Sequence, residues 1–250
     1  KRKSDKTANK NDMKKKENIL INGCSRGLGY DFFEYLKSKY NVYGLSSVKS
    51  DNKKIFYYNP LENIKIGDLL KKKIKTLKIN HVIHCSGGGF KKHDKLLEVK
   101  SLIDLFNVNF YSIYEINRAL IQNKLKKQKL NIIMIGSIAA IENKASIGYS
   151  AAKSVLFNYN KNLAINFVNE KVISKLVIPG SFLSTNGSMK RLKNKNIKIY
   201  NKIKKLMPNT KMQKSIDIIQ FTEFLLKNES DLLNGSYVSL SNLETKSIFL

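Results

Sequence analysis

The chain lacks tryptophan and has few cysteines, histidines and prolines. Its 250 residues include two cysteines, three histidines and three prolines. Two cysteines are too few for a disulfide framework, so we expect Cys24 and Cys85 to be reduced and the protein to be cytoplasmic. His81, His84 and His93 have no partners at metal-ligand spacing, and we expect structural or solvent-exposed roles for them rather than a metal site. No apolar run approaches the ~18–20 residues of a membrane span.

Acidic residues are also scarce. The sequence has 46 lysines and arginines against 19 aspartates and glutamates, a formal net charge of +27 at pH 7. No acidic residue occurs between Lys171 and Ile216, and basic residues crowd one part of this stretch: Lys190, Arg191, Lys193, Lys195, Lys198, Lys202, Lys204 and Lys205. Such a segment attracts an anionic substrate or an acidic carrier protein. It is equally compatible with a solvated helix face in a lysine-rich protein.

The first 17 residues differ from the rest. They are rich in lysine and asparagine and show no apolar periodicity, so we expect a disordered or loosely attached tail over residues 1–17. Met13, which three lysines follow, would suit a natural start within this tail. Residues 18–250 have the length of one α/β domain with a sizeable core, and the overall hydrophobic content is 42%.

Strand-like and helical patterns alternate along this domain. The expected strands lie near Ile19–Asn22, Asn41–Leu45, Lys54–Tyr58, His81–Cys85, Asn131–Gly136, Lys171–Ile178 and Ser236–Leu240. Repeated alternation of strand and helix predicts a parallel sheet with helices on both faces. Right-handed crossovers make this a Rossmann-type, doubly wound, seven-stranded α/β fold, in which ligands bind at the carboxyl ends of the strands.

The first expected strand runs into a glycine-rich turn, Gly23-Cys24-Ser25-Arg26-Gly27-Leu28-Gly29, which the helical pattern of residues 30–37 follows. Strand, glycine turn and helix form the context of a dinucleotide site. Glycines allow a tight turn and a close approach to a pyrophosphate, while the helix N-terminus offers N–H groups to its phosphates. The spacing is G-x-x-x-G-x-G rather than G-x-G-x-x-G. A glycine loop that caps an ordinary helix is the alternative interpretation.

A second motif is Tyr149-Ser150-Ala151-Ala152-Lys153, with Ser137 twelve residues before the tyrosine. Tyr149 and Lys153 would lie one turn apart on the same face of a helix. A nearby ammonium favours the phenolate and so lowers the pKa of a tyrosine, which could then exchange a proton with a substrate oxygen. Ser137 ends an apolar, strand-like run and could hold the same oxygen by a hydrogen bond.

Together these motifs resemble the short-chain dehydrogenase/reductase family over about residues 17–241. The matches follow the family's order: Gly23, Gly27 and Gly29 of the glycine motif, then Asn109, Ser137, Tyr149, Lys153 and Pro179-Gly180. One departure is His84-Cys85-Ser86-Gly87, which aligns with the family's Asn-Asn-Ala-Gly segment and replaces both asparagines. A divergent substrate class is one reading of this departure.

The resemblance implies a role for each matching residue. Asn109, Ser137, Tyr149 and Lys153 would form the catalytic set, in which Lys153 also holds the nicotinamide ribose and Asn109 anchors a water of the proton relay. The implied cofactor-binding residues are Gly23, Ser25, Arg26, Gly27, Leu28, Gly29, Ser46, Asn59, Ser86, Gly87, Tyr149, Lys153, Pro179, Gly180 and Ser184, with Thr185 as an alternative to Ser184. Residues 183–210, which include the basic segment, would form a lid over the substrate.

Two positions bear on the choice of cofactor. An NAD site usually has an acidic residue at the end of the second strand, where it binds the ribose 2′-hydroxyl. Here that strand ends in Leu45-Ser46-Ser47-Val48-Lys49, without an acid. Arg26 precedes the second glycine of the loop, where many NADP-using family members carry a basic residue, and a guanidinium pairs well with a phosphate. We therefore expect NADP(H); the alternative is that Arg26 merely faces solvent.

The resemblance implies an NADPH-dependent ketone reductase, most like the 3-oxoacyl-(acyl carrier protein) reductases. A sugar or nucleotide-sugar ketoreductase of surface-polysaccharide synthesis is the second interpretation, because Tyr237–Asn242 lacks the Asp-Gly-Gly with which acyl reductases tend to end. A non-catalytic NADP-binding or nucleic-acid-binding protein is the third. Nucleic acid is disfavoured because aromatic residues are not grouped with the basic ones as a stacking platform requires.

Apolar residues on two expected helices bear on assembly. Ala152, Leu156, Tyr159, Leu163 and Phe167 recur at spacings of three and four, and residues 102–121 are also rich in apolar positions. In the family these helices form dimer and tetramer interfaces, so the resemblance implies a homodimer or homotetramer. The alternative is that both stripes face only the sheet.

Overall fold

The computed structural model describes residues 16–90, 96–142, 145–207, 209–228 and 230–244. Its main feature is a parallel sheet of seven strands in the order β3-β2-β1-β4-β5-β6-β9. These strands are β1 (Asn18–Asn22), β2 (Asn41–Ser46), β3 (Ile55–Tyr57), β4 (His81–His84), β5 (Leu130–Ile135), β6 (Val172–Pro179) and β9 (Tyr237–Leu240). The predicted seven-stranded, doubly wound fold is confirmed, with each strand within two residues of its expected bounds.

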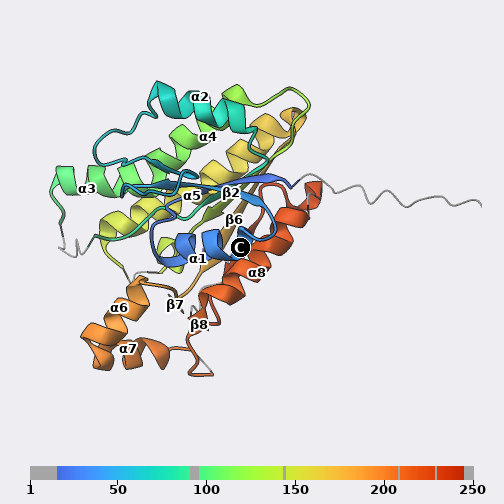
Figure 1. Ribbon diagram of the computed structural model, residues 1–250. Coiled ribbons are helices and arrows are strands. Elements are labelled where there is room, and N and C mark those ends of the chain that lie inside the picture. The colour runs from blue at the N-terminus through green and yellow to red at the C-terminus, as the bar shows by residue number, and fades with distance from the viewer. Residues whose placement is uncertain (1–15, 91–95, 143–144, 208, 229, 245–250) are drawn as a thin grey trace, which may run out of the picture.

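Helices cover both faces of the sheet (Figure 1). On one face lie α2 (Asp68–Leu77), α4 (Ser112–Asn123) and α5 (Ile147–Phe167), whose apolar residues share a core cluster with the sheet. On the other face, α1 (Gly27–Leu36) and α8 (Ser215–Lys227) share a second core cluster with it. Strands β1, β4, β5 and β6 are buried almost throughout, as parallel strands between two helical layers must be.

The register brings the strand ends to one edge of the sheet. Asn22, which ends β1, pairs with His84, which ends β4, and Ile135 of β5 pairs with Val177 of β6. After β1 the chain winds toward β2 and β3, and from β4 it winds the other way, so the strand order reverses between β1 and β4. Such a reversal leaves a crevice outside the carboxyl ends of the strands, which is where ligands bind in this class of sheet.

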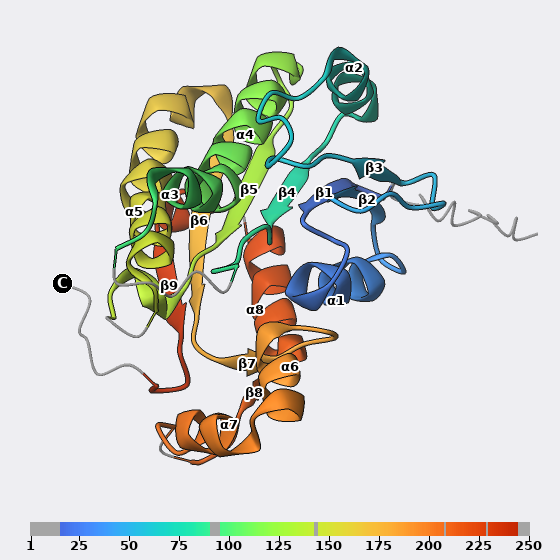
Figure 2. The ribbon, with the colours of Figure 1, turned by 90° about the vertical axis from the view of Figure 1, so that its left-hand side faces the viewer.

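A small subdomain projects beyond this edge (Figure 2). It contains α6 (Ser188–Lys195), α7 (Ile197–Lys204), and a two-stranded parallel pair formed by β7 (Phe182–Leu183) and β8 (Gln213–Lys214). The β7–β8 pair was not predicted, because its strands have two residues each and show no period. The subdomain contains residues 183–210, for which the sequence predicts a lid, and we call it the lid after that predicted role.

Besides a one-turn π-helix, η1 (Asn107–Tyr111), the described chain contains one further α-helix and three 3₁₀ turns. They are α3 (Val99–Phe106), η2 (Ile138–Ala140), η3 (Val168–Glu170) and η4 (Asp231–Leu233). No helix in the described part of the chain is long and apolar enough to cross a bilayer.

The tail expected at residues 1–17 is only partly described. Residues 1–15, including Met13, lie outside the described residues, as does His93. Lys16 and Glu17 contact the domain: the Asn41 amide N–H donates to the Glu17 carbonyl at 3.0 Å, and Lys16 Nζ donates to the Ser38 carbonyl at 2.7 Å. These two residues therefore belong to the folded domain rather than to a loose tail.

The apolar stripe of α5 packs on the sheet. Ala152 and Leu156 are fully buried and Leu163 is 5% exposed, while Tyr159 and Phe167 pack partly buried against the same core. The stripe is thus explained by the interior of one protomer, and an oligomer has to use other residues of these helices.

Glycine at position 29 is a steric requirement of the fold. An ideal Cβ on Gly29 would lie 2.1 Å from the Gly23 carbonyl oxygen, a backbone atom that no side-chain rotation can move. A Cβ on Gly89 would meet nothing within 4 Å. We expect Gly29→Ala to lower the free energy of unfolding by about 1–3 kcal/mol, as overpacking does. Gly89→Ala should leave it unchanged or slightly raise it. Urea denaturation of both variants tests this, and equal stability of the two would contradict it.

Candidate active site

The glycine loop begins the site. Gly23 and Gly27 have φ angles of +86° and +63°, a backbone conformation that favours glycine, and α1 starts at Gly27, three residues earlier than expected. Arg26 is the N-cap residue of α1, but its side chain makes no capping hydrogen bond, and the first turn contains no acidic residue. The N-terminus of α1 thus keeps the positive dipole end that binds phosphates. Loop shape and charge fit the diphosphate of a dinucleotide.

The residues expected near the adenosine end lie around the ends of β2 and β3. Ser46 Oγ donates to the Val48 carbonyl at 2.6 Å and accepts from the Val48 N–H at 2.9 Å, so this buried hydroxyl shapes the turn after β2. Asn59 Nδ2 donates to Glu62 Oε1 at 2.9 Å in the turn after β3. Arg26 is exposed. Of these side chains, the arginine is the one left facing outward with a charge.

Lys153 is the buried cation of the site. Its side chain is 3% exposed, and Nζ donates to the Ile135 carbonyl at the end of β5, 2.9 Å away. A Cβ on Gly87 would lie 3.1 Å from the same Nζ, so the loop after β4 packs closely on the lysine, and Gly87 has a φ of +153° that favours glycine. Burial lowers the pKa of Lys153 to about 8. The predicted lysine is thus held at the carboxyl edge of the sheet.

Asn109 faces the same loop from the other side. It lies in a one-turn π-helix, η1 (Asn107–Tyr111), that joins α3 to α4. Its buried side chain donates to the carbonyls of Leu105 at 2.8 Å and Gly88 at 3.1 Å, and accepts from the Gly88 N–H at 3.1 Å. A Cβ on Gly87 would lie 2.7 Å from Asn109 Oδ1. Lys153 and Asn109 therefore converge on Gly87, and π-turns of this kind often mark functional positions.

Ser137 and Tyr149 form the polar pair of the site. Ser137 precedes η2, where its Oγ accepts from the Ala139 N–H at 3.1 Å, and its side chain also shares a hydrogen bond with the Tyr149 hydroxyl. Burial raises the pKa of Tyr149, and the hydrogen bond with Ser137 offsets this only in part. We expected Lys153 to lower the pKa of Tyr149. The net shift is upward because the neighbours of the phenol desolvate it, which reasoning from helical spacing leaves out.

The segment His84–Gly87 is supported by a buried polar network that the sequence did not predict. His84 is fully buried, and burial lowers its pKa to about 4, so the ring is neutral. Its Nε2 lies 2.8 Å from Asn117 Oδ1, and its Nδ1 lies 3.3 Å from Asn22 Nδ2. Asn22 Nδ2 also donates to Ser86 Oγ at 2.8 Å. The histidine that replaces a family asparagine is therefore linked to Ser86 through Asn22.

The thiols next to this network stay protonated at neutral pH because burial raises their pKa values. Cys24 and Cys85 are free, as expected, and burial raises the pKa of Cys24 to about 11 and that of Cys85 further still. His81 is also structural, since its ring lies 3.1 Å from a Glu17 carboxylate oxygen. The described residues contain no cluster of histidine, cysteine and carboxylate side chains that could hold a metal ion.

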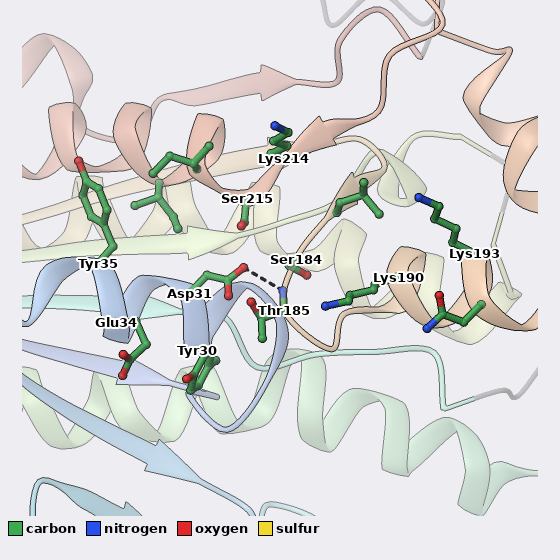
Figure 3. Close-up of a pocket in the computed structure, with 14 residues that line it drawn as sticks. Tyr30, Asp31, Glu34, Tyr35, Ser184, Thr185, Lys190, Lys193, Lys214 and Ser215 are labelled. Carbon is green, nitrogen blue, oxygen red and sulfur yellow. Dashed lines mark hydrogen bonds between the residues drawn. The ribbon is translucent and has the colours of Figure 1, made fainter.

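The segment after β6 leads from the sheet to the lid. A Cβ on Gly180, which follows Pro179, would lie 2.7 Å from the Ser241 carbonyl oxygen, so a backbone atom crowds this position too, though less closely than at Gly29. Ser184 is buried and Thr185 is exposed. Both line a cavity of about 780 Å³ between α1, the lid and the start of α8 (Figure 3). The cavity does not reach Ser137, Tyr149 or Lys153.

The comparison with known families identifies the chain. Residues 65–196, more than half of its length, match the family described as short chain dehydrogenase. The chain belongs to the short-chain dehydrogenase/reductase family. It is therefore an oxidoreductase of this family.

Curated family members of similar sequence carry one activity in their names. The 3-oxoacyl-[acyl-carrier-protein] reductase FabG of Buchnera aphidicola subsp. Baizongia pistaciae is 28% identical over 245 residues, which cover 90% of this chain and 96% of the relative. The enzyme of the same name from Escherichia coli is 26% identical over 180 residues, covering 66% of this chain and 73% of the relative. Within the family, the chain is thus similar to the 3-oxoacyl-(acyl carrier protein) reductases.

Solved structures of short-chain dehydrogenases show the same fold. The complex of 4-hydroxyisoleucine dehydrogenase with NADH has a TM-score of 0.82 at 19% identity and covers 93% of this chain and all of the other. ElxO with NADP bound has a TM-score of 0.77 at 20% identity and covers 91% of this chain and 98% of the other. These neighbours carry different nicotinamide cofactors, so they leave the choice between NAD and NADP open.

The buried ammonium of Lys153 should be visible in the stability of the protein. Its folded-state pKa of about 8 lies below the ordinary 10.5, so protonation below pH 8 occurs in both states and the folded state carries the cost of the buried charge. We expect Lys153→Met to raise the free energy of unfolding by about 1–3 kcal/mol near pH 6–7, after the loss of one hydrogen bond.

The stability gain of Lys153→Met should shrink as pH rises from about 8 toward 10.5, because Lys153 of the folded wild-type protein is then neutral. Denaturant unfolding between pH 6 and 10 measures the difference, with Lys161→Met, an exposed position on α5, as the control. A gain in Lys153→Met that stays constant across this range would refute the buried ammonium.

Proposed function

We propose that the protein is an NADPH-dependent reductase that converts the ketone of a 3-oxoacyl thioester into a secondary alcohol, with Asn109, Ser137, Tyr149 and Lys153 as its catalytic residues. The observation that carries this proposal is the position of Lys153. Its ammonium lies between the Ile135 carbonyl and Gly87, one helical turn after a tyrosine that shares a hydrogen bond with Ser137. A buried cation is costly for the fold, and a lysine whose pKa is lowered in this way, one helical turn from a tyrosine, has a use in proton transfer.

Tyr149 is the proton donor in this proposal. Its raised pKa keeps the phenol protonated at neutral pH, so it can give a proton to the oxygen of a substrate carbonyl. Ser137, already bonded to that hydroxyl, orients the same oxygen and stabilises its developing negative charge. Lys153 supplies positive charge beside the phenolate that remains, and Asn109 holds the loop on which Lys153 packs.

The cofactor is held by the glycine loop and the strand ends. NADPH, when bound, supplies the hydride that adds to the carbonyl carbon. The dipole end of α1 and the backbone of residues 23–29 bind its diphosphate, and Arg26 pairs with the 2′-phosphate. The absence of an acid after β2 supports the phosphorylated cofactor, since a carboxylate there would repel it.

The lid favours an anionic substrate. Its basic residues are exposed on α6 and α7, except Lys204, which is partly buried. A cationic lid raises the encounter rate with an acidic carrier protein or with an anionic thioester. Similarity to curated 3-oxoacyl-(acyl carrier protein) reductases supports the carrier-bound substrate.

A homodimer or homotetramer and a cytoplasmic location remain part of the proposal. The stripe on α5 is used inside the protomer, but Tyr111 in η1, Tyr114 on α4 and Ile165 on α5 are 43%, 48% and 72% exposed. These residues could meet another copy of the chain, and light scattering coupled to gel filtration would give the number of copies.

Turnover tests the proposed reaction. We expect loss of NADPH absorbance when a 3-oxoacyl thioester is added, faster when the thioester is carried by acyl carrier protein. Tyr149→Phe should lower turnover by about 10²–10⁴-fold, because it removes the general acid, and should still bind NADPH. Tyr114→Phe, an exposed position, serves as the control. Substantial turnover by Tyr149→Phe would overturn the assignment.

If the wild-type protein binds NADPH but does not reduce thioesters, its substrate belongs to another class of anionic ketones. Keto sugars and nucleotide sugars would then be offered in the same assay. Turnover with one of them would establish the sugar ketoreductase and remove the acyl substrate from the proposal.

Cofactor preference depends on Arg26. We expect Arg26→Ala to weaken NADPH binding by about tenfold or more, because a charge-assisted bond to a phosphate is lost, and to leave NADH binding nearly unchanged. Fluorescence titration of both cofactors measures this, with Arg118→Ala on α4 as a control for loss of one positive charge. The assignment fails if the wild-type protein binds NADH as tightly as NADPH, or if Arg26→Ala keeps full NADPH affinity.

A further inference from the structure

One residue of the segment after β7 bonds to α1 through both of its backbone polar groups. The Thr185 carbonyl accepts from the Gly27 N–H at 2.7 Å, and the Thr185 N–H donates to Asp31 Oδ2 at 3.1 Å. Figure 3 shows the second bond, with Asp31 on α1 and Thr185 on the segment that leads to α6. Asp31 follows Gly27 by four residues, so both lie on one face of the helix.

The segment around Thr185 is a compact turn. The Gly187 N–H donates to the Ser184 carbonyl at 3.1 Å, Asn186 has a φ of +54°, and the Arg191 guanidinium donates to the Asn186 carbonyl. A Cβ on Gly27 would lie 3.8 Å from Ser184 Oγ, in ordinary contact. We call residues 184–187 the strap, because they lie directly on the first turn of α1.

The strap occupies the Gly27 N–H, a hydrogen-bond donor that a cofactor phosphate would otherwise use. Gly27 is the first residue of α1, and an N–H at this position of a glycine-loop helix points toward a bound diphosphate. A carbonyl oxygen on that N–H and a phosphate oxygen on the same N–H exclude each other. The carboxylate of Asp31 secures the carbonyl there by holding the other side of the same residue.

We propose that Asp31 is a positioning residue that latches the strap onto the glycine loop and thereby weakens the binding of NADP(H). This rests on the proposed function, in which α1 binds the cofactor diphosphate. We call the two hydrogen bonds of Thr185, to the Gly27 N–H and to Asp31, the latch. Binding of the cofactor releases Gly27 from Thr185, so the latch couples occupation of the cofactor site to movement of the segment that leads into the lid. Breaking the latch lowers the net free energy of cofactor binding.

Glu34 provides a matched comparison. It lies one turn further along α1 and lines the same cavity, but its carboxylate pairs with Lys37 at 2.6 Å rather than with the strap. Lys190 and Lys193 line the cavity on the lid side. Removal of the charge of Glu34 therefore changes the electrostatics of the cavity without touching the latch.

The first test is the dissociation constant of NADPH, measured by fluorescence titration without substrate. We expect Asp31→Ala to bind NADPH about three- to tenfold more tightly, the equivalent of about one hydrogen bond. Asp31→Asn should stay close to the wild type, because its amide oxygen can accept the Thr185 N–H. Glu34→Gln should also stay close to it. Unchanged or weaker binding by Asp31→Ala, or equal tightening by all three variants, would overturn the latch.

The second test does not depend on the cofactor. Hydrogen exchange of the Gly27 amide in the ligand-free protein reports the bond to Thr185 directly. We expect Asp31→Ala to speed this exchange several-fold, and Asp31→Asn and Glu34→Gln to leave it unchanged. Equal exchange rates in all four proteins would refute the latch. If the wild-type protein failed to bind NADPH, the proposed function would fail while the exchange rates still decided whether Asp31 holds the strap.

Discussion

The buried ammonium of Lys153 is the constraint around which the site is built. A charge taken out of water destabilises a fold unless polar atoms receive it, and here the Ile135 carbonyl at the end of β5 does so at 2.9 Å. Gly87 in the loop after β4 packs closely on the lysine, and the side chain of Asn109 approaches the same glycine. Strand end, loop and π-turn meet at one point because the parallel register brings the ends of β4 and β5 to one edge.

Support for this point comes from the layer beneath it. The neutral ring of His84 links Asn117 of α4 to Asn22 of β1, and Asn22 carries the network on to Ser86. Because these side chains bond to one another, the network favours one arrangement of its members, and it supports the loop that lacks both family asparagines. Lys153 and Asn109 are thus held by their own hydrogen bonds, and the loop beside them is held by the bonds of Asn22 and His84.

The sequence predicted the sheet, which the structure confirms, and indicated the candidate site residues, because both leave local signals. Apolar runs separated by helical periods marked the seven strands, and short spacings marked the glycine loop and the Tyr149–Lys153 pair. Contacts between distant residues left no such signal: Asp31 and Thr185 are 154 residues apart, and Asn22 and His84 are 62 apart. The upward pKa shift of Tyr149 could not be predicted from the sequence for the same reason. Burial depends on the whole fold, whereas helical spacing depends on four residues. Asp31 could have been suspected from its place four residues after Gly27.

In the proposed reaction, a protonated, buried Lys153 supports proton donation by Tyr149. The pH dependence of kcat for NADPH-dependent reduction of a 3-oxoacyl thioester tests it most directly. Since the pKa of Lys153 is lowered to about 8, the ammonium is lost as pH rises through that value, and kcat should fall with an apparent pKa near 8. A kcat that stays level to pH 10 would contradict the account, because the reaction would then proceed without the charge that the whole site accommodates.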